Sequence, residues 1–304
     1  MIREGFVIDR KKMIKGYLCA ICSAVIYGCM PLMAKLIYME GVSPMTLVFL
    51  RNFLALPVLA FLALWQGKTL AIPLRAMPSI TALGVMGYGI TTLLLFNAYN
   101  YIASGTATVL HFIYPAVVVV AGMLVDRDKI RKGNIISVVI CVVGVSFFYS
   151  PGEPLNWRGI AVALLSGVTY AGYILMLSGF RYKKITGFLF SFYVAAATSA
   201  VMLAACLVAG QLALPQTLKG WALCTLFSVV ITAGAVVLFQ QGTFMIGGER
   251  ASILSTLEPL TSVLVGVVVF REPMGMRVVL GSLLVLLASF LIAFFDMRQT
   301  KEST

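Results

Sequence analysis

The chain has 304 residues, of which 61% are hydrophobic and only 11% are charged, and its formal net charge is +12. A soluble protein carries about 25% charged residues to cover its surface. This composition excludes a water-soluble globular protein. It also excludes the collagen-like, disulfide-rich and disordered classes, because Gly, Pro and Cys are not enriched and apolar residues are abundant.

Ten apolar segments are long enough to cross a hydrocarbon core of about 30 Å as helices. The fifth and the tenth are the shortest, the connections leave no room for a soluble domain, and we expect the first segment to be retained because it lacks a signal-peptide cleavage pattern. The predicted spans are residues 16–37, 44–65, 77–98, 104–125, 134–149, 159–180, 186–209, 220–241, 250–270 and 277–295.

The basic residues predict the orientation of these spans. With both termini on the cytoplasmic side, 17 of the 23 Lys and Arg residues lie on that side and five on the other, while Arg51 lies within the second span. The positive charge therefore follows the membrane topology and forms no patch on a folded surface, so we expect no nucleic-acid partner.

An internal repeat divides the chain into halves. A shift of 144 positions matches residues 103–145 to the second half, with Pro115 falling on Pro259 and Arg127 on Arg271. A shift of 143 matches the first span to the sixth, with Tyr27 falling on Tyr170. Each half holds five spans, and because five is odd, the halves must enter the membrane from opposite sides.

The sequence thus predicts an all-α polytopic membrane protein of ten transmembrane helices in two inverted five-helix repeats. The repeats are expected at residues 13–149 and 157–296, with cytoplasmic tails at 1–12 and 297–304. Inverted repeats favour two nearly equivalent packings around a shared midplane site, which is the basis of alternating-access transport.

The residues of several spans also carry a family resemblance. The chain resembles the EamA-type ten-span transporters of the drug/metabolite transporter superfamily over residues 13–296. That resemblance implies a membrane protein of prokaryotic inner membranes or eukaryotic organelles, often an exporter of small metabolites, with a central cavity between its halves. The matching residues are Tyr27-Gly28, Lys35, residues 49–55, Tyr114-Pro115, Glu258-Pro259 and Arg271-Glu272-Pro273.

Glu258 is the sharpest candidate for a site within the membrane. It lies eight residues into the ninth span, which is about 12 Å along a helix. A charge there costs roughly 2.5 to 3.5 kcal/mol, so the carboxylate should face the bundle interior, pair with another group or take up a proton. The alternative is a structural hydrogen bond to a neighbouring helix.

Pro115 and Pro259 occupy equivalent positions of the two repeats. Each removes a backbone donor and so frees the carbonyl four residues earlier, at His111 and Ser255. We expect those carbonyls to be met by protein, water or substrate, since lipid offers no donor. The alternative is a kink packed by neighbouring hydroxyls. His111, the only histidine, is either a proton relay or a satisfied core residue.

Two basic residues lie within the predicted spans. Arg51 is some seven residues inside the second span, so we expect a Tyr, a backbone carbonyl or Glu40 as its partner. The resemblance makes Arg51 either a gate or scaffold residue or a ligand. Lys35, nearer the outer end of the first span, is interpreted as a snorkelling anchor.

Other polar residues lie on spans that we expect to face a cavity. Hydroxyl and amide groups beside aromatic rings suit a zwitterion or a planar ring, although Tyr is also an ordinary packing residue. The candidate substrate-binding residues are Tyr27, Asn97, His111, Tyr114, Tyr170, Tyr173, Gln240, Gln241, Ser255 and Glu258, with Lys35, Arg51, Pro115 and Pro259 as gate or scaffold residues.

Metal, cofactor and enzyme functions are not predicted. Cys19, Cys22 and Cys29 share one face of the first span, but no histidine lies near them in sequence, so they are interpreted as small packing residues. No hydrolase, metalloprotease or nucleotide-binding motif is present, so we expect no enzymatic activity.

The sequence therefore predicts a secondary-active transporter of an amino-acid-like or nucleoside-like metabolite, working as an exporter in the inner (plasma) membrane. Its expected partners are a small-molecule substrate, the lipid bilayer and protons as the coupling ion, and it is expected to be a monomer or a homodimer. The alternative function is a lipid flippase or a channel-like facilitator.

Overall fold

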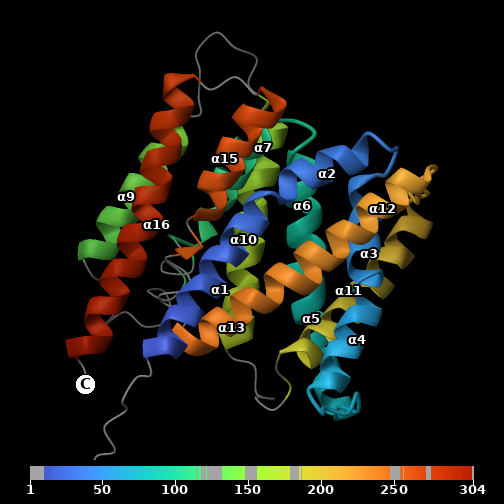
Figure 1. The fold of residues 1–304 in the computed structure, drawn as a ribbon. Helices are drawn as coiled ribbons and strands as arrows, with labels where there is room; N and C mark the ends of the chain where they lie inside the picture. Colours follow the sequence, from blue (N-terminus) through green and yellow to red (C-terminus); the bar gives the residue numbers. More distant parts are fainter. Residues whose placement is uncertain are drawn as a thin grey trace, which may run out of the picture.

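The protein is a bundle of helices, seen here in a computed structural model (Figure 1). The structure describes residues 10–114, 116–117, 121, 132–147, 156–178, 185, 187–246, 254–255, 257–271 and 275–302. In every predicted span, most of the described residues lie in helix. The chain is an all-α polytopic membrane protein, as predicted.

The helical elements follow one another along the whole described chain. They are α1 (Arg10–Gly28), α2 (Met30–Tyr38), α3 (Pro44–Phe53), α4 (Leu56–Trp65), the 3-10 helix η1 (Leu74–Ala76), α5 (Met77–Leu83), the π-helix η2 (Gly84–Ile90), α6 (Thr91–Ala98), α7 (Ser104–His111), α9 (Lys132–Ser146), α10 (Trp157–Ser178), α11 (Phe188–Val208), α12 (Leu218–Phe227), the π-helix η4 (Ser228–Ala235), α13 (Val236–Ile246), α15 (Leu257–Phe270) and α16 (Met276–Glu302).

Five stretches of the described chain are long and apolar enough to cross a membrane, namely residues 13–38, 44–65, 74–98, 188–208 and 218–239. Several of them are interrupted rather than straight. Prolines lie in the first turn of α2, α3, α4 and α5. Proline is tolerated there because the N–H groups of a first turn form no hydrogen bond within the helix. The first span is therefore two helices that meet at Cys29, and the second is two that meet at Leu54 and Ala55.

The third and eighth spans share an unusual backbone. Each contains a π-helical segment, η2 at Gly84–Ile90 and η4 at Ser228–Ala235. The two segments begin 144 residues apart, which is the repeat shift found in the sequence. π-Helices are rare and concentrate at functional sites, so both halves have the same local irregularity at the same place.

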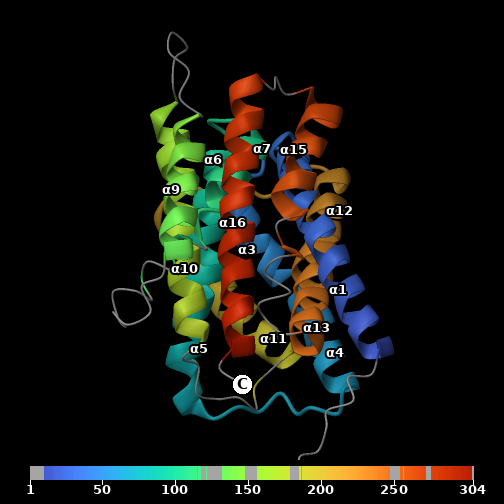
Figure 2. The same cartoon turned by 90° about the vertical axis from the view of Figure 1, so that its left-hand side faces the viewer.

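The helices pack in groups that repeat across the two halves. α1 packs along α13 and α15, while its repeat-equivalent α10 packs along α6 and α7. α11 lies against α3 and α4. α9 and α16 pack on each other at one side of the bundle (Figures 1 and 2).

Close glycine contacts show that the two halves are related by the repeat. A Cβ atom built on Gly16 would lie 2.6 Å from Ile246, and one built on Gly159 would lie 2.7 Å from Ile102. These are equivalent pairs under the shifts of 143 and 144. The first contact lies where α1 begins beside the end of α13, and the second lies where α10 begins beside the end of α6. The two contacts are at opposite ends of the bundle, as inverted repeats require.

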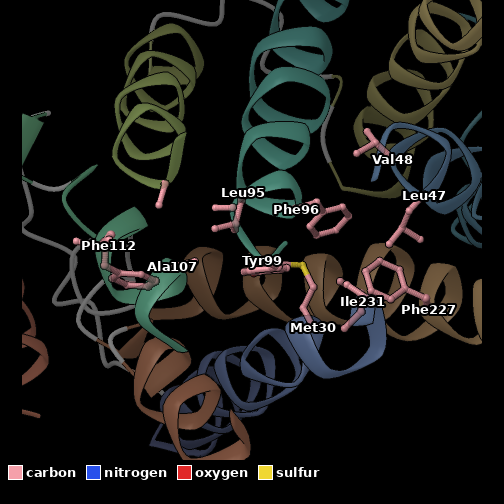
Figure 3. Close-up of a cluster of buried hydrophobic side chains, with 14 of the residues drawn as sticks. Met30, Leu47, Val48, Leu95, Phe96, Tyr99, Ala107, Phe112, Phe227 and Ile231 are labelled. Atoms are coloured by element: carbon pink, nitrogen blue, oxygen red, sulfur yellow. The ribbon is translucent and has the colours of Figure 1, made fainter. Parts of the chain in front are cut away.

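The larger apolar core lies toward the end of the bundle at which α2 ends and α7 begins, the upper end in Figure 1. Met30, Phe96, Tyr99, Phe112 and Phe227 are among its members, and they come from both halves of the chain (Figure 3). A second core joins α4, α5 and the beginning of α11. The sequence predicts the upper end to be the outer one.

α1, α13 and α15 form one group of helices, and α6, α7 and α10 form the other. The two groups approach each other most closely in this upper half, between α7 and α15. A Cβ atom built on Gly105 would lie 2.9 Å from the Cα atom of Val263. Nearby, the Ser262 hydroxyl donates a hydrogen bond to Thr108 Oγ1 at 3.1 Å. Only a residue without a side chain fits at position 105.

A polar cluster also joins the two halves at the upper end. Lys219 Nζ lies 2.8 Å from Glu40 Oε1, and the Thr217 hydroxyl donates to Glu40 Oε2 at 2.5 Å. Thr217 Oγ1 also accepts the N–H of Gly220 and so caps the N-terminus of α12. The Glu40 carboxylate thus lies at the positive end of a helix from the other half.

Helix continues beyond the predicted spans at both ends of the described chain, and one cysteine prediction was wrong. α16 runs over Met276–Glu302, so its helix continues through most of the predicted C-terminal tail. α1 likewise begins at Arg10, inside the predicted N-terminal tail. Helix outlasts the apolar segments here because Lys, Arg, Glu and Gln are good helix formers. Among the cysteines, Cys22 is exposed rather than packed.

We predict that Gly105→Ala destabilises the protein by about 1 to 3 kcal/mol, because the new methyl group meets the backbone of Val263. Gly172→Ala, in α10, is the matched control, since nothing lies within 4 Å of its Cβ position. Thermal unfolding in detergent micelles measures both. A Gly105→Ala protein as stable as the Gly172→Ala protein would contradict the close α7–α15 contact.

The Glu40 cluster makes a pH-dependent contribution to stability. Hydrogen bonds from Lys219 and Thr217 hold the pKa of Glu40 below its usual value of 4.5. A carboxylate with a lowered pKa stabilises the folded state above the unfolded pKa, and this contribution is lost as the pH falls through the folded pKa. We therefore expect Glu40→Gln to lower the thermal midpoint at pH 7, with a deficit that shrinks below pH 4.5.

Lys219→Gln removes the same ion pair from the other side, so the double variant should lose little more than either single variant. An undiminished deficit of Glu40→Gln at pH 3.5, or full additivity at pH 7, would show that the ion pair does not stabilise the fold.

Candidate functional site

Five aromatic side chains meet in the middle of the bundle. They come from η2 (Tyr88), the end of α7 (His111), the segment after α7 (Tyr114) and α10 (Tyr170 and Tyr173). The rings of Tyr114 and Tyr170 stand edge to face with centroids 4.8 Å apart, and Tyr173 stacks on Tyr170 at 5.6 Å. We call these five residues the aromatic cluster.

His111 connects the aromatic cluster to α10 by a hydrogen bond. Its ring is buried, with centroids 5.3 Å from Tyr170 and 5.8 Å from Tyr114. Its Nδ1 lies 2.8 Å from Ser166 Oγ, and the same hydroxyl donates to the carbonyl of Ala163. The Ser166 hydroxyl uses its proton to donate to that carbonyl, so its oxygen accepts the hydrogen bond from His111 Nδ1. The histidine proton therefore lies on Nδ1.

The backbone beside His111 is held by a glycine of α10. α7 ends at His111, and a Cβ atom built on Gly167 would lie 2.5 Å from the His111 carbonyl oxygen. This is the carbonyl that Pro115 was expected to free. Pro115 itself lies outside the described residues, and the close approach of α10 to this carbonyl is a packing contact, not a hydrogen bond. Only glycine allows that approach.

Around Glu258 the ninth span is interrupted in the same way. Ser255 forms a turn and α15 begins at Leu257, which places Pro259 in the first helical turn. The carbonyl of Ser255 accepts the N–H of Glu258 at 3.0 Å. The expected free carbonyl is therefore satisfied by the protein. In the described residues, both equivalent spans have a turn just before their prolines, at Phe112–Ile113 and at Ser255, as in the discontinuous helices of transporters.

Glu258 faces the same region from α15 and is half-buried. It lies close enough to Tyr27, Tyr99, Tyr114 and Tyr170 to interact with each of them electrostatically. Within the described part of the chain, its carboxylate forms neither a hydrogen bond nor an ion pair. The structural hydrogen bond to a neighbouring helix that was the alternative for this residue is thus not found among the described residues.

Arg51 lies on α3 with only 4% of its surface exposed. Its Nε donates to Thr232 Oγ1 of η4 at 3.2 Å, and its Nη1 lies 3.9 Å from Met30 Sδ. The guanidinium carbon lies 5.8 Å from the centre of the Phe96 ring and 5.7 Å from that of Phe227, both in the core of Figure 3. Of the expected partners, Glu40 is wrong, because it pairs with Lys219 instead.

Tyr27 links the two charged residues. It is half-buried near the end of α1, and it interacts electrostatically with Arg51, Glu258, Tyr88 and Tyr170. The structure therefore brings together six of the ten predicted binding residues, together with Arg51. These six are Tyr27, His111, Tyr114, Tyr170, Tyr173 and Glu258.

The other predicted residues lie apart from this set or are less fully described. Asn97 donates to the carbonyl of Leu93 in its own helix at 2.8 Å. Gln241 is half-buried on α13, and Gln240 lies in the same helix, although its side chain is outside the described residues. Ser255 is buried beside Glu258, and Lys35 is half-buried on α2.

Sequence reasoning missed Tyr88, Tyr99, Ser166 and Thr232. The signal for Ser166 was present, because it matches Ser23 in the repeat, and Ser23 also bonds across helices, to the carbonyl of Ala235 at 2.7 Å. Tyr88 and Thr232 are likewise equivalent positions, at a shift of 144. Both lie in π-helical segments, whose altered register no hydrophobic periodicity of an α-helix would predict.

Known proteins resemble this chain along most of its length. A transporter of Bacillus subtilis (strain 168), named an uncharacterized transporter YcbK, is 28% identical over 287 residues, covering 88% of each chain. A biotin transporter of Escherichia coli (strain K12) is 21% identical over 227 residues, which are 73% of this chain and 75% of that protein. A solved crystal structure of 15% identity has a TM-score of 0.64 and covers 93% of this chain and 98% of its own, which shows a shared fold.

The model of the EamA-like transporter family matches the chain twice, at residues 14–150 and at residues 157–294. The two matches follow the two halves that the repeat and the glycine contacts relate. The relatives are named transporters, in agreement with the polar cluster inside a membrane bundle. The chain belongs to the EamA-like transporter family and is a multi-pass membrane transporter.

Proposed function

We propose that the protein is a secondary-active transporter that exports a small amino-acid-like or nucleoside-like metabolite by alternating access around a central cavity. The observation that carries this proposal is the set of polar groups inside an apolar bundle. Tyr27, Tyr88, Tyr114, Tyr170 and Glu258 all keep some accessible surface, although they lie on helices that enclose one another. Polar side chains in such a place line a substrate path in membrane proteins.

The packing of the helix groups supports alternating access. The α1–α13–α15 group and the α6–α7–α10 group meet through the upper core, the Gly105–Val263 contact and the Ser262–Thr108 bond. Because the halves are inverted copies, an equivalent set of contacts could form at the other end of the bundle in a second packing. Exchange between two such packings would expose the aromatic cluster to one side at a time.

The aromatic cluster supports a cargo with a flat or apolar part. Stacked and edge-to-face rings offer both apolar faces and hydroxyl groups. One relative is named a biotin transporter, and biotin is a small bicyclic carboxylate, so it belongs in a test panel beside amino acids and nucleosides.

Glu258 supports protons as the coupling ion. Its carboxylate lies in the bundle without a hydrogen bond or ion pair from any described residue. A proton or a cationic cargo group would neutralise it, and either would change the cost of moving the site between the two sides. His111 is less suited to this role, because its ring is packed among the cluster and bonded to Ser166.

The remaining features of the proposal concern the protein in its membrane. We place it in the inner (plasma) membrane as a monomer or homodimer, with both termini cytoplasmic, in agreement with the lysine and arginine bias of its loops. α1 begins and α16 ends at the same end of the bundle, as an even number of spans requires (Figure 1).

The experiment that tests this function begins with a thermal-shift screen of the purified protein against amino acids, nucleosides and biotin. Flux of the stabilising compounds is then measured in proteoliposomes with and without a pH gradient. We expect saturable flux that an opposing gradient of the same compound accelerates. Non-saturable flux would indicate a channel-like facilitator, and transfer of labelled lipid between leaflets would indicate a flippase.

We predict that Glu258→Gln lowers flux at least tenfold and removes its response to a pH gradient, while the protein still folds, because the amide keeps the size of the carboxyl group but binds no proton. Glu40→Gln is the matched control, since it removes a carboxylate outside the site. Flux in proteoliposomes measures both. A Glu258→Gln protein with unchanged pH-driven flux would remove Glu258 from the mechanism.

A further inference from the structure

We infer that the cargo carries an anionic group and that Arg51 is the residue that binds it. This inference rests on the proposed transport function, and it narrows the cargo to compounds with a carboxylate or a similar anion. Three observations support it. The charge of Arg51 is unmatched among the described residues, Arg51 lies next to the aromatic cluster, and the equivalent position of the other repeat holds no arginine.

The charge of Arg51 has no counter-charge among the acidic side chains that the structure describes. Glu40 and Glu258 are the two acidic residues whose side chains the structure describes, and neither forms an ion pair with Arg51. A guanidinium has five N–H donors, but here the bonded partners are one hydroxyl oxygen and one thioether sulfur. A buried cation without an anion is costly, so an anion that arrives with the cargo would relieve that cost.

Arg51 lies beside residues that neighbour or belong to the aromatic cluster. The guanidinium lies near Tyr27, Tyr88 and Tyr99. Tyr27 and Tyr88 are half-buried and also interact with the rings on α10, while Arg51 itself is almost fully enclosed. An anion held by Arg51 would therefore belong to a cargo whose remaining part lies among the tyrosines.

The inverted repeat provides an internal control for the role of this arginine. On one side, the hydroxyl of Ser228 in η4 donates to the carbonyl of Leu50 in α3. On the other, a Cβ atom built on Gly84 in η2 would lie 2.8 Å from the carbonyl of Val194 in α11. These pairs are equivalent at the shift of 144, so the same junction between helices is built twice.

At that junction the residue equivalent to Arg51 is Ala195, which is fully buried. The fold therefore forms this junction without a cation, and packing alone does not require Arg51. The guanidinium also contacts the rings of Phe96 and Phe227, but an aromatic ring is not an anion and cannot accept two parallel hydrogen bonds from the guanidinium. The forked donors of Arg suit a carboxylate, for which a neutral amide of the same shape is a poor substitute.

The test compares each anionic ligand with its neutral carboxamide. Biotin against biotinamide and L-phenylalanine against L-phenylalaninamide are the matched pairs, and adenosine is a ligand without an anion. Binding to the purified full-length protein is measured by thermal shift and calorimetry, and uptake is measured in proteoliposomes. We expect at least one carboxylate to bind roughly tenfold or more tightly than its amide, because the charge-assisted hydrogen bonds are lost.

In Arg51→Gln we expect that difference between carboxylate and amide to disappear, and in Arg51→Lys to persist in weaker form. Lys219→Gln is the matched control, because it removes an exposed cation outside the site and should leave the preference unchanged. The comparison of ligands on the unaltered protein stands even if Arg51→Gln fails to fold.

The inference is overturned if no carboxylate of the panel binds, if the amides bind as well as the acids, or if Arg51→Gln keeps the preference. Saturable flux of adenosine that is unaffected by Arg51→Gln would overturn the anionic cargo while leaving the transport function in place. Absence of saturable flux for every compound would instead contradict the proposed function itself.

Discussion

Lipid offers no hydrogen bonds, so the polar groups of a membrane-embedded chain must find their partners within the protein. This constraint governs the irregular places of the bundle. Where Pro259 removes a donor, the carbonyl of Ser255 takes the N–H of Glu258. The π-helical segments η2 and η4 lie beside the same region. Interruptions of helical hydrogen bonding cost free energy inside a membrane. In this protein they are concentrated where polar side chains project into the bundle.

Much of the fold follows from patterns that the sequence shows directly. Apolar run lengths predicted the spans, and the repeat predicted paired contacts such as Gly16–Ile246 and Gly159–Ile102. Helix ends were less predictable, because α16 continues through polar residues that favour helix as strongly as the apolar ones before them. The π-helices could not be predicted, since a change of hydrogen-bond register leaves no mark on hydrophobic periodicity.

The site was predictable where cost alone identifies a residue, and less so where geometry decides. Glu258, Arg51 and His111 stand out because charged or titratable groups are expensive in lipid. The partners of Arg51 were not evident, because Thr232 is 181 positions away in sequence and meets it only through the packing of α3 against η4. Tyr88 was overlooked for the same reason. The amide of Asn97 bonds within its own helix, and its binding role stays a prediction.

A symmetric scaffold with asymmetric charges has consequences for how such a carrier is driven. Glu258 is equivalent to Tyr114, and Arg51 to Ala195, so each charge exists in one half only. The two charges form no ion pair with each other, yet Tyr27 and Tyr99 interact electrostatically with both of them. In the proposed cycle, a cargo anion neutralises Arg51, while a proton or a cargo cation neutralises Glu258. The empty site would then keep unbalanced charge in a medium of low dielectric constant, where charge is most costly. Such a carrier would change sides more readily when loaded than when empty, which is the requirement for exchange of one bound ligand against another.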